Sequence, residues 1–382
     1  MDITTDLGTQ TKLRASHEWP LAVSVITAAL FLSFGSQWLG DLSHPAWFAC
    51  MLMWLFTVIL LSAFAVIRHA EVIAEQLGEP IGTLVLTLSV TGIEVMMIAA
   101  VMHGGKGNAT LARDAMFAVV MIVLNGMVGL SLLLGGLRYH EQTYNLQGAN
   151  AFLAVIVPLA VFGLVLPNFT VSSPGPTLSP LQTAFLIIMS IGLYGVFLAI
   201  QIWSHRSYFV LPEIEQGLMG AHRLPGQHER GGLSVRYPIG MLLAYLLPLV
   251  VLSKQLAIPI NYGMHELQAP PALGGLLVAI LVLSPESLGA ARAALANQLQ
   301  RSVNILLGSV LATISLTIPA VLLIGFTTSQ IIILGLDAAD MTILLLTLGL
   351  STLTFASART NVLLGAVHLL LFLAYVMLIF EK

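Results

Sequence analysis

The chain has 382 residues, of which 57% are hydrophobic and 9% are charged, and its formal net charge at pH 7 is −3. In soluble domains about a quarter of the residues are charged, so this composition excludes a soluble globular protein and indicates a membrane protein. The sequence has no basic tract for nucleic-acid binding. Its single cysteine, Cys50, excludes an internal disulfide and a cysteine-based metal cluster.

Apolar stretches long enough to cross the bilayer recur along the whole chain. They predict an all-α polytopic membrane protein with about eleven transmembrane helices. The first stretch follows a polar N-terminus and precedes no small-residue cleavage site, so we interpret it as a permanent span and not as a signal peptide. The expected spans lie at about residues 20–40, 45–66, 80–102, 115–137, 150–168, 181–203, 237–257, 272–291, 302–325, 340–357 and 360–380.

The positions of Lys and Arg predict the orientation of these spans. Eleven of the 15 Lys and Arg residues fall on one side of the membrane if the N-terminus is cytoplasmic, and cytoplasmic loops are the ones enriched in these residues. We therefore expect a multi-pass protein of the inner (plasma) membrane with a cytoplasmic N-terminus and an extracytoplasmic C-terminus. The long polar segment 204–236 then lies in the cytoplasm, where we interpret its His and Glu residues as part of a solvated linker.

Two expected spans, one on each side of segment 204–236, resemble each other. The stretches "GEPIGTLVLTLSVTGIEVMM" and "PPALGGLLVAILVLSPESLG" each place a glutamate at a similar depth after a proline; these are Glu94 and Glu286. The two positions are five spans apart in the chain, and because this offset is odd, the second copy runs through the membrane in the opposite direction. Inverted repeats of this kind are typical of transporters.

The two glutamates are the strongest candidates for function. A charged side chain in hydrocarbon is costly, so an intramembrane glutamate is by default a candidate functional residue. Burial favours the protonated form of a carboxyl group, whereas a bound cation favours the ionised form. Proton and cation therefore compete for the same oxygens, which suffices for antiport if only the occupied states cross between the two sides.

The neighbours of the glutamates favour cation binding. Pro285 has no N–H group, so it leaves the carbonyl of Leu281 without its helical partner, and Gly92 is expected to loosen the other helix in a similar place. We therefore predict helix breaks at Gly92 and Pro285. Oxygen atoms at broken helices suit hard cations such as Ca²⁺ and Na⁺. The candidate ligands beside the glutamates are Thr91, Ser284, Asn125, Asn304 and the Leu281 carbonyl.

Several polar residues have an alternative, structural interpretation. Asn, Ser, Thr and Gly inside spans also serve as contacts between helices. The polar residues after the second span form either an entry vestibule or an interfacial surface; they are Arg68, His69, Glu71, Glu75 and Glu79. Asp114 beside Arg113 is interpreted as an interfacial pair. His368 lies within a span without a histidine at i+4 or i+7, so paired haem ligation is not supported.

The residues around both glutamates resemble a known family. The pattern around "EPIGTLVLTLSVTGIEV" and the run "LVLSPESLGAARAALANQLQRSVNILLGSVLATISLTIP" are similar to the calcium/proton exchangers of the calcium:cation antiporter superfamily, and most of all to their bacterial calcium/sodium/potassium–proton branch. The resemblance implies a first helix and two inverted five-helix repeats. It also implies that Glu94 and Glu286 bind cation and proton, and that Ser309 lies on the second-repeat "N--GS" segment. The chain departs from the family's common "GN--E" form at both glutamates.

The resulting prediction is a cation/proton antiporter, not an enzyme, that exports Ca²⁺, Na⁺ or K⁺ in exchange for protons and needs no cofactor besides the transported ions. A cation channel would use similar ligands and is the alternative. A membrane-embedded enzyme is disfavoured because neither a G-x-S-x-G nor an H-E-x-x-H motif occurs. The expected division of the chain is an N-terminus with the first helix, a first repeat, a cytoplasmic loop and a second repeat, at residues 1–44, 45–203, 204–236 and 237–382.

Overall fold

The computed structural model describes residues 18–77, 81–104, 109–210, 236–266, 268–328 and 331–381. These residues are almost entirely helical, and in chain order they form helical segments at all of the expected spans. The prediction of an all-α protein is therefore confirmed. Most of the cytoplasmic loop expected at 204–236 lies outside the described residues.

The first half of the chain contains six helical spans, three of which change their helical type partway along. The fourth, fifth and sixth spans each contain a π-helical turn (η1, η2 and η4), whereas η3 and η5 are short 3₁₀ helices. The segments are α2 Trp19–Trp38, α3 Pro45–Leu77, α4 Ile81–Gly104, α5 Leu111–Met121, η1 Ile122–Met127, α6 Val128–Tyr139, α7 Leu146–Ala160, η2 Val161–Val165, η3 Leu166–Asn168, α8 Pro180–Ala199, η4 Ile200–Ser204 and η5 Arg206–Phe209.

The second half contains five helices and one short strand that pairs with the first half. The helices are α10 Arg236–Glu266, α11 Pro271–Leu295, α12 Leu299–Thr328, α13 Ala338–Thr354 and α14 Val362–Phe380. The strands β1 Gln142–Thr143 and β2 Arg359–Thr360 pair antiparallel, with Gln142 opposite Thr360. This pairing joins the loop after α6 to the loop before α14.

The helices have the length and composition of membrane spans. Within the described residues, nine are long and apolar enough to cross a bilayer, α13 is a shorter apolar helix, and α4 adds a further 24-residue helix. The chain is thus a multi-pass membrane protein. α3 extends well beyond the expected end of its span, so Arg68, His69 and Glu71 belong to α3, and α10 likewise continues past residue 257 to Glu266.

Polar side chains cap several of these helices where apolar runs begin. Asn145, Ser179, Asp337 and Asn361 each accept a hydrogen bond from a backbone N–H in the first turn that follows. Ser179 and Gln182 form a reciprocal capping box. Such caps satisfy N–H groups that have no partner within the helix, and so they define where α7, α8, α13 and α14 begin.

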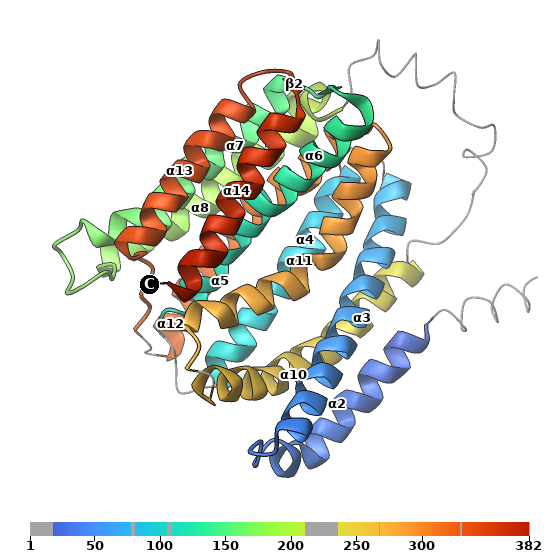
Figure 1. Cartoon of the computed structure of the whole chain (residues 1–382), viewed down its shortest axis with the longest axis vertical. Coiled ribbons are helices and arrows are strands. Elements are labelled where there is room, and N and C mark those ends of the chain that lie inside the picture. The colour runs from blue at the N-terminus through green and yellow to red at the C-terminus, as the bar shows by residue number, and fades with distance from the viewer. Residues whose placement is uncertain are drawn as a thin grey trace, which may run out of the picture.

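The helices pack in two groups. α2, α3 and α10 lie together at one edge of the molecule, α7, α8 and α13 lie at the opposite edge, and α4 and α11 lie between them (Figure 1). One hydrophobic cluster joins α2, α3 and α10 to parts of α4 and α11, and a larger cluster contains most of the remaining helices. α12 is the most deeply buried of the nine candidate spans and contacts α4, α7, α8 and α11.

Glycines allow α14 to approach the fourth span closely. A Cβ atom added at Gly129 would lie 2.9 Å from the backbone nitrogen of Leu369, and one added at Gly365 would lie 2.6 Å from the nitrogen of Leu133. The two backbones are therefore in direct contact, as in the small-residue interfaces of many membrane helices.

We expect Gly129→Val to destabilise the protein, because the added atoms would overlap the α14 backbone, and overpacking typically costs about 1–3 kcal/mol. The measurement is the melting temperature of the purified protein in detergent. Gly349→Val is the matched control, since a Cβ atom there would meet nothing within 4 Å. Equal melting temperatures for the two variants would contradict this account of the interface.

Candidate functional site

Glu94 and Glu286 lie on the two helices at the centre of the molecule. Glu94 is on α4 and Glu286 is on α11, with 2% and 3% of their surfaces exposed. α4 and α11 contact each other, and both contact α12. Their carboxyl groups both reach hydroxyls of α12, at Ser309 and Thr313. The glutamates that are far apart in the sequence are thus neighbours in the fold.

α12 bridges the two glutamates with a pair of hydroxyl groups. Ser309 Oγ donates a hydrogen bond of 2.6 Å to Glu286 Oε2, and Thr313 Oγ1 donates one of 2.6 Å to Glu94 Oε2. Positions four residues apart share one face of a helix, about 6 Å apart along its axis. One face of α12 therefore holds a carboxyl group from each of the other two helices.

Each carboxyl group keeps one oxygen without a hydrogen bond. Glu94 Oε1 and Glu286 Oε1 are buried and have no partner within the described residues, and the same is true of Thr91 Oγ1, one turn before Glu94 on α4. A buried polar atom without a partner is costly. These three oxygens, together with the Ser309 and Thr313 hydroxyls, are of the kind that hard cations bind.

The two expected helix breaks are not present, which corrects that prediction. α4 continues through Gly92 and α11 continues through Pro285. A proline removes one hydrogen bond from a helix, but packing on both sides can keep the helix continuous. The Leu281 carbonyl still cannot receive a hydrogen bond from Pro285, because proline has no N–H group. Ser284 Oγ donates to the carbonyl of Ile280 in its own helix.

The two asparagines make their hydrogen bonds away from the glutamates. Asn125 Nδ2 donates to Thr347 Oγ1 at 2.8 Å, and its Oδ1 faces His368. Asn304 Nδ2 donates to the carbonyl of Phe209 at 2.7 Å, and its Oδ1 accepts from Gln300. Both amides are thus engaged in contacts between helices, which was the alternative interpretation of such residues.

The sequence interpretation missed Thr313. The signal that would identify it is its position four residues after Ser309, because that spacing places both hydroxyls on one face of a helix. Without the structure, nothing distinguished Thr313 from the other hydroxyl residues of the same span.

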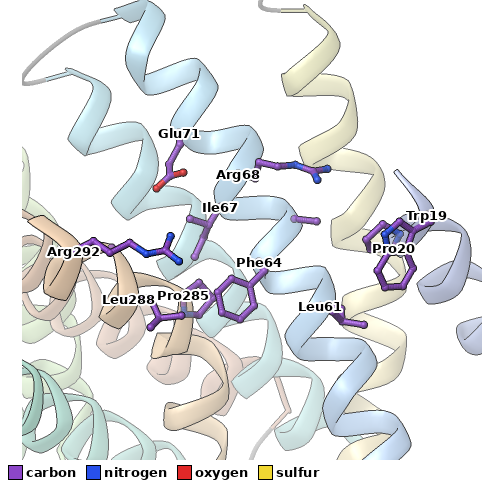
Figure 2. A pocket seen from close by; sticks show the side chains of 12 residues that line it. Trp19, Pro20, Leu61, Phe64, Ile67, Arg68, Glu71, Pro285, Leu288 and Arg292 are labelled. Atoms are coloured by element: carbon purple, nitrogen blue, oxygen red, sulfur yellow. The ribbon is translucent and has the colours of Figure 1, made fainter. Parts of the chain in front are cut away.

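A cavity of about 490 Å³ reaches the turn of α11 that carries Glu286. Side chains of α3 and α11 face it from opposite sides, with Phe64 across from Pro285, and Arg68, Glu71 and Arg292 provide its charges (Figure 2). Its lining comes from the start of α2, from one face of α3 and from one face of α11: Trp19, Pro20, Leu61, Phe64, Ala65, Ile67, Arg68, Glu71, Pro285, Leu288, Gly289 and Arg292.

The polar residues near the end of α3 divide between this cavity and a cluster between helices. Arg68 donates to Glu18 Oε1 at 2.9 Å, His69 Nε2 lies 3.3 Å from Glu18 Oε2, and the Tyr245 hydroxyl donates to Glu18 Oε2 at 3.1 Å. This cluster ties α3 and α10 to the residue that precedes α2. The charged end of α3 thus contributes both to a cavity and to a packed contact.

The structure also contains the expected pair of Arg113 and Asp114. Arg113 Nη2 lies 2.8 Å from Asp114 Oδ1, and Arg113 Nη1 donates to the carbonyl of Gly335. The pair therefore anchors the start of α5 to the segment before α13.

Comparison with known proteins identifies the family. Residues 47–203 and 237–381 match the family described as "Sodium/calcium exchanger protein". The chain belongs to this sodium/calcium exchanger family. It is therefore a membrane exchanger of cations and not an enzyme, as the sequence predicted. The two matched regions leave out segment 204–236.

Individual relatives agree with this membership. The chain is 42% identical over 324 residues to the sodium-potassium/proton antiporter ChaA of Escherichia coli (strain K12), which covers 84% of this chain and 86% of the relative. It is 23% identical over 266 residues to a Ca²⁺/H⁺ antiporter of Aphanothece halophytica, covering 62% of this chain and 70% of the relative.

The fold of this exchanger is shared with solved structures. The structure of native YfkE has a TM-score of 0.70 and 17% sequence identity, covering 95% of this chain and all of that chain. The H⁺/Ca²⁺ exchanger CAX has a TM-score of 0.65 and 16% identity, covering 94% and 87%. At these identities the comparison supports the fold of the exchanger.

We expect Thr313→Val to weaken cation binding roughly tenfold, because a hydrogen bond to a charged group contributes about 1.5–3 kcal/mol. The measurement is the cation concentration that gives half-maximal exchange in vesicles. Thr313→Ser keeps the hydroxyl and should stay close to the native value. Thr342→Val is the control for a hydroxyl that bonds only its own helix, to Ala338. A Thr313→Val variant with native affinity would remove Thr313 from the site.

Proposed function

We propose that this exchanger exports Na⁺, K⁺ or Ca²⁺ from the cytoplasm across the inner membrane and takes up protons in return. The observation that carries the proposal is the pair Glu94 and Glu286. Each accepts a hydrogen bond from one face of α12 and keeps one buried oxygen without a hydrogen bond within the described residues. The names of the relatives support proton coupling, with Na⁺ and K⁺ in one case and Ca²⁺ in another.

The proposed cycle follows from the charge of the two carboxyl groups. Within the described residues neither carboxyl group has an Arg or Lys partner, so a proton or a cation must neutralise it inside the membrane. On the cytoplasmic side both glutamates release protons and bind cation. After the site opens to the other side, the cation leaves and both groups bind protons again. Two protons then carry the same charge as one divalent cation.

The oxygens near the pair support this role. Each carboxyl group presents its free oxygen, and the hydroxyls of Thr91, Ser309 and Thr313 lie on the same three helices. In the proposed site Glu94 and Glu286 bind the cation directly. The three hydroxyls supply neutral oxygens, as does the carbonyl of Leu281, because Pro285 does not use it.

We propose that the two halves of the chain are the inverted repeats expected from the sequence. The helix contacts support this. If each helix is replaced by its counterpart in the other half, the contact of α4 with α12 becomes the contact of α11 with α5. In the same way, the contact of α12 with α8 becomes the contact of α6 with α14, and all four contacts are present. With α4 as the third span and α11 as the eighth, the two glutamate helices cross the membrane in opposite directions. An odd number of spans puts the two termini on opposite sides of the membrane, and in the proposed orientation, which rests on the distribution of Lys and Arg, the N-terminus is cytoplasmic and the C-terminus lies outside.

The cavity in Figure 2 is the proposed cytoplasmic access to the site. It lies between α3, which packs with α2 and α10, and α11, which carries Glu286. Arg68 and Arg292 lie at the ends of their helices that the distribution of Lys and Arg assigns to the cytoplasm. Closure between α3 and α11, with opening on the other side, would then provide alternating access.

Glu94→Gln and Glu286→Gln should each reduce exchange by more than about tenfold, since loss of residues that merely hold metal ligands already costs roughly 10–100-fold. The assay uses everted vesicles with an acidic interior and a dye that reports the pH gradient, to which Na⁺, K⁺ or Ca²⁺ is added. Glu141→Gln is the matched control, because Glu141 forms an exposed pair with Arg359. Full activity in both membrane variants would contradict the proposed site. Cation flux without proton movement would indicate a pore.

The access route predicts a directional labelling result. With Cys50 changed to Ser, Leu288→Cys should react with a membrane-impermeant maleimide in everted vesicles and little in right-side-out vesicles. Ile188→Cys is the control, because Ile188 is exposed on α8 but does not line the cavity of Figure 2. Labelling of Leu288→Cys from the outer side only would reverse the proposed orientation.

A further inference from the structure

A second group of buried polar side chains lies outside the glutamate site. It contains Asn125 of η1, Thr347 and Thr354 of α13, and His368 of α14, and none of the four has any exposed surface. Buried polar groups in a membrane protein are costly unless they bind one another. The exchange cycle described above uses none of these residues.

The hydrogen bonds of this group form a chain in which each residue donates to the next, from Thr354 through His368 and Asn125 to Thr347. Asn125 Nδ2 donates to Thr347 Oγ1 at 2.8 Å, and the Thr347 hydroxyl is directed at the sulfur of Met121. Asn125 Oδ1 is therefore an acceptor, and His368 Nδ1, which lies 3.3 Å away, must carry a proton. In the neutral ring His368 Nε2 then accepts from the Thr354 hydroxyl at 2.9 Å. Every member of the chain has a defined role as donor or acceptor.

His368 binds the fourth span where its backbone is irregular. Asn125 lies in the π-helical turn η1, and its side chain faces His368 of α14. A π-helical turn contains an extra residue, so it changes which side chains face the neighbouring helices, and such turns occur frequently at functional sites. His368 thus holds a side chain of this turn.

The other end of the π-helical turn contacts the glutamate helix. Ser287, the residue after Glu286, donates its hydroxyl to the Leu283 carbonyl in its own helix at 2.6 Å, and its Oγ also lies 3.2 Å from the sulfur of Met127, the last residue of η1. α11 contacts η1 and α6 along this stretch. Gly126 in the same turn packs against the ring of Phe372, one turn along α14 from His368. The turn is therefore held between α14 on one side and α11 on the other.

We infer that His368 is a positioning residue for cation binding: through Asn125 it fixes the π-helical turn, and the turn fixes the part of α11 that carries Glu286. The inference rests on the proposed role of Glu286. His368 itself touches neither the cation nor the carboxyl group. Its loss should therefore weaken cation binding without abolishing exchange.

The test compares three variants in the vesicle assay. His368→Leu keeps the bulk of the side chain but removes both hydrogen bonds, whereas His368→Asn keeps a donor near the position of Nδ1. Phe372→Leu disturbs the packing on Gly126 without touching a polar group. We expect His368→Leu to raise the half-saturating cation concentration roughly three- to tenfold, below the 10–100-fold effects of residues that hold metal ligands directly. His368→Asn should recover most of this loss, and the maximal rate per molecule should stay within about twofold.

The outcomes separate positioning from general stability. A native half-saturating concentration in His368→Leu would overturn the inference. So would a loss of affinity in Phe372→Leu that matches that of His368→Leu at an equal drop in melting temperature, because packing alone would then explain it. If Glu286→Gln is fully active, the proposed glutamate site fails first. The inference is supported if His368→Leu raises the half-saturating cation concentration as expected, while the native protein is active and Glu286→Gln is inactive.

Discussion

The structure depends on the burial of two carboxyl groups in the middle of a membrane protein. Glu94 and Glu286 have almost no exposed surface, and within the described residues each is bound by one hydroxyl of α12 and by no cationic side chain. A permanent Arg or Lys partner would neutralise a carboxylate without any ion from solution. Because the protein provides hydroxyls instead, the charge remains to be neutralised by a proton or a cation, and the proposed exchange uses this property.

The rest of the fold can be understood as support for this pair. α12 is buried among the other helices and presents Ser309 and Thr313 to α11 and α4. Behind α11, the π-helical turn η1 is held against α14 by glycines and by His368. On the other side lie α3 and the charged cavity that separates it from α11. The site thus has a rigid side formed by close helix contacts and a side where two groups of helices meet.

Much of the fold could be predicted from the sequence because hydrocarbon imposes simple rules. A span needs about 20 apolar residues, so all of the helices appear as apolar runs. A glutamate inside such a run is conspicuous, so Glu94 and Glu286 were identified. The unbroken helices at Gly92 and Pro285 were not predictable, because continuity depends on packing against neighbouring helices. The amides of Asn125 and Asn304 were equally ambiguous, since a buried amide suits a cation and a neighbouring helix alike.

The sequence by itself determined that the chain crosses the membrane many times and that two of its spans carry a costly acid. Both properties follow from the free energy of transferring single side chains into hydrocarbon, which depends on local composition. Only the tertiary structure decided which hydroxyls bind those acids. Thr313 reaches Glu94 from a helix 219 residues further along the chain, and His368 reaches Asn125 from 243 residues away. Such contacts are set by how helices pack, and helix packing depends on many small side chains together.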